Sequence, residues 1–241
     1  MKYKLSHIKH ILSHPLTKGG LFKTLFKYLF FHIIYRNKTE IIIPFLDKKM
    51  TIIKGMGGQA NYFMFLKDYE EMLFLGHYLN SEDTFIDIGA NIGSYSLLAA
   101  ITKEPVIHAF EPNIKISKIL NKNIKMNNLQ NKIILHNYAL GEKNGYAHLV
   151  DNGACSHISV DKNDRLDKIK MKKLDSIINK ADIIKIDVEG YEKNVLIGSC
   201  NLLESSDLNV IIIEMAGDNR YGYNDEKVHS FLSKYGFAPY S

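Results

Sequence analysis

The most informative part of the sequence is Thr84–Ser96, TFIDIGANIGSYS. A short apolar run, Phe85–Ile88, has the character of a buried strand, and a turn with two glycines separates it from an apolar run typical of a helix. This order of strand, glycine turn and helix is typical of nucleotide-type cofactor sites in α/β proteins. The turn lacks the third glycine of the dinucleotide fingerprint GxGxxG, which disfavours a nicotinamide oxidoreductase.

The turn fits a different spacing, the Asp-x-Gly-x-x-x-Gly pattern of proteins that bind S-adenosylmethionine. Asp87 stands two residues before Gly89, and Gly93 follows four residues later with Asn91 between the glycines. The glycines let the backbone lie against the amino-acid part of such a cofactor. We expect the carboxylate of Asp87 to lie near its ammonium group.

A second acid supports this prediction. Glu111 follows the apolar run Val106–Phe110 and stands 24 residues after Asp87. A carboxylate at the end of the next strand can accept hydrogen bonds from both ribose hydroxyls of a nucleoside cofactor. The alternative is that Asp87 and Glu111 are helix-capping or surface carboxylates. Together, the turn and the second acid predict S-adenosylmethionine as the cofactor.

Strand and helix patterns alternate on both sides of this turn. Several expected strands are continuous apolar runs, as in a parallel sheet covered by helices on both faces. We therefore predict an α/β fold with a doubly wound, mostly parallel sheet. The expected strands are 85–88, 106–110, 132–136, 182–187 and 209–214, after a hairpin of 40–45 and 49–54. The expected helices are 69–79, 95–102, 114–127, 173–179, 192–198 and 226–235, and residues 138–150 are expected to form a loop and an edge pair.

The motifs of residues 55–240 resemble those of the FkbM-type methyltransferases. The resemblance rests on FIDIGANIGSYS, HAFEPN, LNKNIKMNN, HNYALGEKNG, IIKIDVEGYEKNVLIG and IIIEM, in this order. It implies a Rossmann-like class I methyltransferase fold and S-adenosylmethionine as the methyl donor. The implied acceptor is an oxygen of a sugar or glycan, a polyketide or a similar small molecule. Asp87, Gly89, Asn91 and Gly93 would line the methionine end, Glu111 the ribose, and Asn137 to Ala139 the adenine.

The resemblance also implies more sheet than the chain provides. The family fold ends in an antiparallel hairpin, whereas only Gly236–Ser241 remains after the last expected helix. We expect a chain cut short at its C-terminal strands, or a sheet that lacks an edge strand.

The carboxylates after the fourth strand are the catalytic candidates. Methyl transfer to a hydroxyl needs a group that takes the proton of the acceptor. Asp187 ends IIKID, and Glu189 and Glu192 follow it. We predict Asp187 as the base or the acceptor-orienting residue, with Glu189 and the loop histidine His157 as further candidates.

Alternatives remain open for these groups. Asp187 and Glu189 could instead cap the next helix. Asp187 could hold a divalent metal together with Glu214, although we predict no metal site. Lys185, a charge inside an expected strand, is a candidate partner for a neighbouring carboxylate.

Charge is concentrated at the N-terminus. Residues 1–36 carry seven basic side chains and no acid, which leaves 24 basic and 26 acidic residues in the remainder. The body of the protein is therefore a poor match for nucleic acid. The sequence also lacks the motifs of DNA methyltransferases, which excludes DNA as the acceptor. RNA or nitrogen methylation remains the alternative, as does a cofactor-binding, non-catalytic subunit at a membrane.

Residues 1–54 are expected to form an extension of the methyltransferase domain at 55–241. Within the extension, Leu21–Tyr35 has an apolar helical face, and Lys23 and Lys27 lie opposite it. Three interpretations remain open for this helix: it packs on the domain, it lies on anionic lipid, or it contacts a partner. The two cysteines form no CxxC pair, which fits a cytoplasmic protein. The sequence leaves the oligomeric state undetermined.

Overall fold

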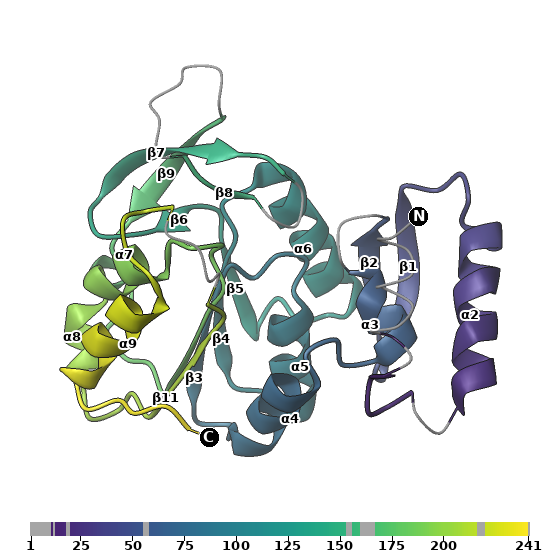
Figure 1. The fold of residues 1–241 in the computed structure, drawn as a ribbon, viewed down its shortest axis with the longest axis horizontal. Helices are drawn as coiled ribbons and strands as arrows, with labels where there is room; N and C mark the ends of the chain where they lie inside the picture. The colour runs from purple at the N-terminus through teal and green to yellow at the C-terminus, as the bar shows by residue number, and fades with distance from the viewer. Residues whose placement is uncertain are drawn as a thin grey trace.

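The centre of the molecule is a five-stranded parallel sheet (Figure 1). The computed structural model describes residues 11, 13–17, 20–54, 58–152, 156–159, 167–215 and 220–240. The strand order is β11-β10-β3-β4-β5, and every neighbouring pair is parallel. The bounds are β3 Thr84–Ile88, β4 Val106–Phe110, β5 Ile133–His136, β10 Ile183–Ile186 and β11 Val210–Ile213. This confirms the predicted α/β, Rossmann-like fold.

Helices cover both faces of this sheet (Figure 1). On one face lie α4 (Tyr69–Tyr78), α5 (Ser94–Thr102) and α6 (Ile114–Met126). On the other lie α7 (Glu192–Ile197), α8 (Cys200–Leu203) and α9 (Asp225–Ser233). Successive residues of β3 pack against the helices of opposite faces, because the side chains of a strand point to the two sides of the sheet in turn. Phe85 belongs to the first core cluster, and Ile86 and Ile88 belong to the second.

The structure corrects the prediction in three places. The helix expected at 173–179 is only a short 3₁₀ turn, η3 (Leu174–Ser176), and α8 was not predicted. The loop and edge pair expected at 138–150 belong to a second sheet of four strands, ordered β6-β9-β7-β8. Its strands are β6 Ala139–Leu140, β7 Gly145–Val150, β8 His157–Ile158 and β9 Asp167–Lys172. Strand β9 was not predicted, because it has only two buried residues, Ile169 and Met171, and lysines stand on both sides of each.

The N-terminal extension contains α2 (Leu21–Ile34) and the antiparallel hairpin of β1 (Glu40–Phe45) and β2 (Lys48–Ile53). Helix α3 (Gln59–Met64) follows it. Helix α2 and the hairpin were both predicted. The hairpin shares a core with the domain, since its buried residues Ile41, Ile43 and Phe45 lie in one cluster with those of α5 and α6. The division at residue 54 remains a prediction.

Asn123 of α6 joins the hairpin to the glycine turn. Its side chain is fully buried and donates to the carbonyl oxygens of Thr51 (3.0 Å) and Ile92 (2.9 Å). Its Oδ1 accepts the backbone N–H of Thr51 at 2.6 Å. A buried amide with three hydrogen bonds fixes the position of both segments. The N-terminal extension thereby supports the turn that was predicted to hold the cofactor.

Strand β11 forms one edge of the central sheet. Its four residues are all half-buried, unlike the fully buried strand β10 beside it. Among the described residues 220–240, only α9 is a regular element. The expectation about missing C-terminal strands remains a prediction. Within the described part of the chain, no helix has both the length and the apolar character needed to cross a bilayer.

Candidate functional site

The turn between β3 and α5 places its backbone at the carboxyl end of the sheet. Gly89 has φ +79° and Gly93 has φ +96°, which favour glycine. A Cβ at Gly89 would lie 1.8 Å from the carbonyl oxygen of Asp187, and one at Gly93 would lie 2.4 Å from the side chain of Leu120. The turns after β3 and β10 therefore meet closely only because residue 89 has no side chain.

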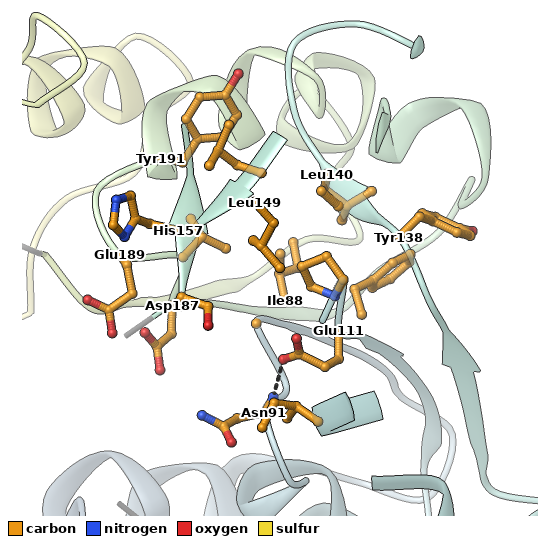
Figure 2. A pocket seen from close by; sticks show the side chains of 18 residues that line it. Ile88, Asn91, Glu111, Tyr138, Leu140, Leu149, His157, Asp187, Glu189 and Tyr191 are labelled. Atoms are coloured by element: carbon orange, nitrogen blue, oxygen red, sulfur yellow. Dashed lines mark hydrogen bonds between the residues drawn. The ribbon is translucent and has the colours of Figure 1, made fainter. Parts of the chain in front are cut away.

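Glu111 closes this turn from the end of β4. One carboxylate oxygen accepts the backbone N–H of Asn91 at 2.9 Å, and the other accepts that of Asn113 at 2.8 Å. The side chain is 7% exposed, and burial raises the pKa of Glu111 to about 7 despite both hydrogen bonds. The carboxylate is thus held at a fixed position in the wall of a pocket (Figure 2).

Asp87 lies behind the turn and does not line this pocket. Its side chain shares the face of β3 that Phe85 uses, and Ser96 Oγ donates to its Oδ2 at 2.6 Å. Burial raises the pKa of Asp87, while Lys185 and Ser96 oppose the rise. Its buried Oδ1 has no hydrogen-bond partner among the described residues. This orphaned oxygen fits the prediction that Asp87 lies near the cofactor's ammonium, which remains untested.

The pocket has a volume of about 670 Å³, including its open mouth. Seven of the ten predicted site residues line it: Gly89, Asn91, Glu111, Ala139, His157, Asp187 and Glu189. Asp87, Gly93 and Asn137 do not line it; Asn137 is exposed and donates to the carbonyl oxygen of Glu111 at 2.8 Å.

The predicted catalytic residues gather on one side of the pocket. Figure 2 shows Asp187, Glu189 and His157 beside one another, with Asn91 and Glu111 across from them. They come from two parts of the fold, because His157 belongs to β8 of the second sheet and the two acids follow β10. The pocket is therefore lined by cofactor candidates on one side and by proton acceptors on the other.

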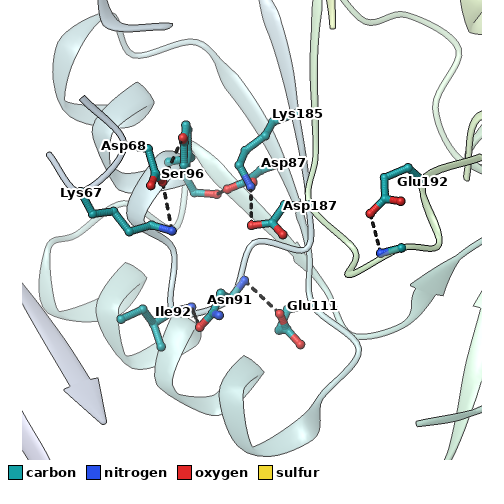
Figure 3. A network of polar contacts seen from close by, with 12 residues as sticks. Lys67, Asp68, Asp87, Asn91, Ile92, Ser96, Glu111, Lys185, Asp187 and Glu192 are labelled. Atoms are coloured by element: carbon teal, nitrogen blue, oxygen red, sulfur yellow. Dashed lines mark hydrogen bonds and ion pairs between the residues drawn. The ribbon is translucent and has the colours of Figure 1, made fainter. Parts of the chain in front are cut away.

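Lys185 holds the carboxylate of Asp187. Its Nζ lies 3.1 Å from Asp187 Oδ2 and 4.6 Å from the ring centre of Tyr95 (Figure 3). The Lys185 side chain is only 4% exposed, against 23% for Asp187. Tyr95 in turn donates to Asp68 Oδ2 at 3.1 Å. The lysine in the strand thus has the carboxylate partner that was predicted for it.

The turn after Asp187 has a strained geometry. Glu189 has φ +55°, a left-handed conformation that is uncommon outside glycine, and Gly190 follows with φ +100°. Glu192 stabilises the turn, since its Oε1 accepts the N–H of Gly190 at 2.7 Å. The N-cap residue of α7 is Tyr191, so neither Asp187 nor Glu189 occupies that position.

The apolar wall of the pocket was identified from the sequence only at Tyr138, within the segment Asn137 to Ala139. It includes Tyr138, Leu140, Leu149, Ile158 and Tyr191. Leu149 and Ile158 pair across β7 and β8. His157 of β8 was predicted to reach the site, but β7 was not. Tyr191 could have been found, because it directly follows the Asp187–Gly190 motif.

The structure also bears on the metal alternative. Within the described residues, no group of three histidine, cysteine or acidic side chains is arranged to hold a metal ion. Glu214 follows β11, and its pKa is raised chiefly by the nearby charge of Asp187. The two carboxylates therefore lie close enough to repel each other.

Glu111 is expected to make stability depend on pH. Its folded pKa of about 7 exceeds the ordinary value of 4.5, so the folded state binds the proton more tightly than the unfolded state. Its contribution to stability is complete below pH 4.5 and is lost as the pH rises through 7. Between pH 5 and pH 8 we expect the wild-type protein to lose roughly 2 kcal/mol relative to Glu111→Gln.

Urea unfolding at both pH values measures this difference. Glu82→Gln, an exposed glutamate, is the control and should show no such change. A constant difference between wild type and Glu111→Gln would contradict the prediction.

Comparison with known proteins gives one family match. The model of the family described as "Methyltransferase FkbM domain" matches residues 87–239, which is more than half of the chain. The matched span begins at Asp87 and includes Glu111 and Asp187. No curated protein matches the chain.

Solved structures resemble the chain only weakly. The FkbM methyltransferase of Methylobacillus flagellatus KT is 17% identical, with a TM-score of 0.48 over 65% of this chain and 38% of its own. The TYW2 of M. jannaschii in complex with AdoMet is 17% identical, with a TM-score of 0.49 over 83% and 74%. A precorrin-6y C5,15-methyltransferase of Geobacter metallireducens GS-15 is 16% identical, with a TM-score of 0.45 over 72% and 74%. The chain spans well under two thirds of the first of these.

Proposed function

Because the chain belongs to the FkbM methyltransferase family, we propose that it transfers a methyl group from S-adenosylmethionine to a hydroxyl oxygen of a small acceptor. Family membership confirms the resemblance and the cofactor that the motifs predicted. A sugar or glycan is the proposed acceptor class. The proposal includes a cytoplasmic location and a peripheral membrane contact through residues 21–35.

One observation carries the choice of oxygen. The wall opposite Glu111 presents Asp187, Glu189 and His157, which are groups that accept a proton from a hydroxyl or a hydrogen bond from a polyol. The same acids disfavour a polyanionic acceptor such as RNA, whose phosphates they would repel.

The pocket residues have distinct proposed roles. Bound S-adenosylmethionine supplies an electrophilic methyl group on a sulfonium. Glu111 accepts hydrogen bonds from the ribose hydroxyls, and Asn91 belongs to the turn that faces the methionine end. Asp187 orients the acceptor hydroxyl and takes its proton. Because Lys185 engages Asp187 Oδ2, Oδ1 is the atom proposed to receive this proton.

Positioning is the main contribution of the rest of the pocket. A methyl transfer is an in-line displacement, so the acceptor oxygen must stand close to the methyl group and in line with the breaking bond. The apolar residues Leu149 and Ile158 exclude water from this path, and Tyr191 stands beside the acidic wall. Glu189 and His157 are proposed to bind further hydroxyls of the acceptor.

Isotope transfer tests the proposal. The full chain is incubated with S-adenosylmethionine labelled in its methyl group, and with a panel of sugars, glycans, amino sugars and RNA. We expect label in an alkali-stable methyl ether of a hydroxylated acceptor, and none in RNA. Label on nitrogen or in RNA would favour the alternative acceptors.

Calorimetry separates the cofactor from the acceptor. We expect S-adenosylmethionine and S-adenosylhomocysteine to bind and NAD to give no signal. Binding without transfer to any acceptor would support a non-catalytic subunit. No binding of either adenosyl compound would refute the proposed function.

A further inference from the structure

Helix α2 turns its apolar side chains away from the protein. We call Phe22, Phe26, Leu29, Phe30 and Ile33 the α2 apolar face. Their exposed fractions reach 87% at Phe22, 68% at Phe26 and 72% at Ile33. No core cluster of the described residues includes any of these five side chains. An exposed apolar patch of this kind marks an interaction surface.

The opposite side of α2 fixes this orientation. Phe31 is 1% exposed and packs at 5.1 Å against the ring of Tyr62 and at 5.2 Å against that of Phe63, both in α3. Lys27 lies over the rings of Tyr62 and Phe65 at 4.2 and 4.7 Å. The helix therefore packs on the domain through one side and presents its apolar face to the surroundings. In this geometry one side of α2 can pack on the domain while the other lies on a membrane, so these two expectations are compatible.

The charge around the face indicates what covers it. Residues 1–39 contain no acid, and the exposed basic side chains in or beside α2 are Lys23, Arg36 and Lys38, whereas Lys27 packs on the opposite side. Lys54 adds a further positive charge at the C-terminal end, where its Nζ donates to the carbonyl oxygens of Tyr35 and Arg36. A second copy of the chain would bring like charges together, whereas an anionic lipid surface would neutralise them.

We propose that the α2 apolar face docks on a membrane that contains anionic lipid. The helix lies in the plane of the interface, with its five apolar side chains among the upper acyl chains and the exposed basic residues Lys23, Arg36 and Lys38 at the headgroups. In Figure 1, α2 lies at one end of the long axis, and α8 lies at the other. Docking therefore leaves the C-terminal half of the fold uncovered. The contact is independent of the proposed methyl transfer.

Vesicle flotation of the full chain tests this surface. The probes are vesicles of phosphatidylcholine mixed with phosphatidylglycerol, and vesicles of phosphatidylcholine alone. We expect the wild-type protein to float with the anionic vesicles and to stay mostly soluble with the neutral ones. Phe26→Gln/Ile33→Gln should reduce the bound fraction at least about tenfold, because two exposed anchors are lost.

The matched control replaces two exposed apolar residues outside α2 by glutamine. Val106→Gln/Ile134→Gln alters two other exposed apolar residues, on β4 and β5, at 49% and 44%, and should bind like wild type. Thermal unfolding checks that each variant is folded, and Phe22→Gln/Leu29→Gln provides a second test of the same face. Equal binding by both double variants, or no binding by wild type, would overturn the proposal. A dimer in solution that Phe26→Gln/Ile33→Gln dissociates would also overturn it, by assigning the face to a second copy.

Discussion

Replacing Glu111 by alanine is expected to weaken the binding of S-adenosylmethionine at least about a hundredfold. Two hydrogen bonds from ribose hydroxyls to a carboxylate are each worth about 1.5–3 kcal/mol, and about 1.4 kcal/mol corresponds to a factor of ten. The change also leaves the backbone N–H groups of Asn91 and Asn113 without their acceptor. The glycine turn then loses the contact that holds it against β4.

Calorimetric titration of the purified chain measures this loss. Glu111→Gln should be intermediate, because an amide retains one acceptor oxygen and offers a donor in place of the other. Glu82→Ala is the control, because this exposed glutamate does not line the pocket. An affinity of Glu111→Ala within about threefold of wild type would refute the ribose role.

The cofactor half of the site was predictable because its signals are local. The strand β3, the glycine turn and the start of α5 follow one another within Thr84–Ser96, and their residue types dictate their backbone. Glu111 is set by the end of the next strand, which a parallel sheet brings to the same edge. These residues could be placed without knowing any long-range contact.

Side-chain direction was harder to predict. Asp87 lies near the end of the strand, but because side chains alternate along β3 it points to the side of Phe85 and of Ser96 in α5. The apolar wall at Leu149 and Ile158 depends on pairing between short strands that are distant from the sheet motifs. Neither feature has a signature within a few residues of the sequence.

The α2 helix shows a different limit. Its periodicity correctly identified an apolar face, but periodicity does not state which face packs. The side of α2 that packs on the protein is the narrower one, which carries Phe31 with Tyr28 and Tyr35 beside it. This side packs because α3 presents aromatic rings to Phe31. That choice depends on a neighbouring helix that the sequence analysis did not predict.

The proposed role of Asp187 predicts a separation between binding and chemistry. Asp187→Ala should slow methyl transfer to the hydroxylated acceptor by about 10²–10⁴-fold, the usual contribution of a positioned base. The affinity for S-adenosylmethionine should change little, because Glu111, the proposed ribose ligand, lies across the pocket from Asp187 and the backbone contact between Asp187 and Gly89 is kept. Lys185 keeps a carboxylate neighbour in Asp87, which limits the cost of leaving it buried.

Asp187→Asn distinguishes a base from an orienting group. An asparagine can accept a hydrogen bond from the acceptor but cannot take its proton at neutral pH. A rate as low as that of Asp187→Ala identifies a base, whereas a rate near wild type identifies an orienting residue. Asp207→Ala, an exposed acid away from the pocket, is the control for both variants. If Asp187→Ala transferred methyl groups at the wild-type rate, Glu189 or His157 would have to take the proton, since these are the other predicted acceptors in the same wall.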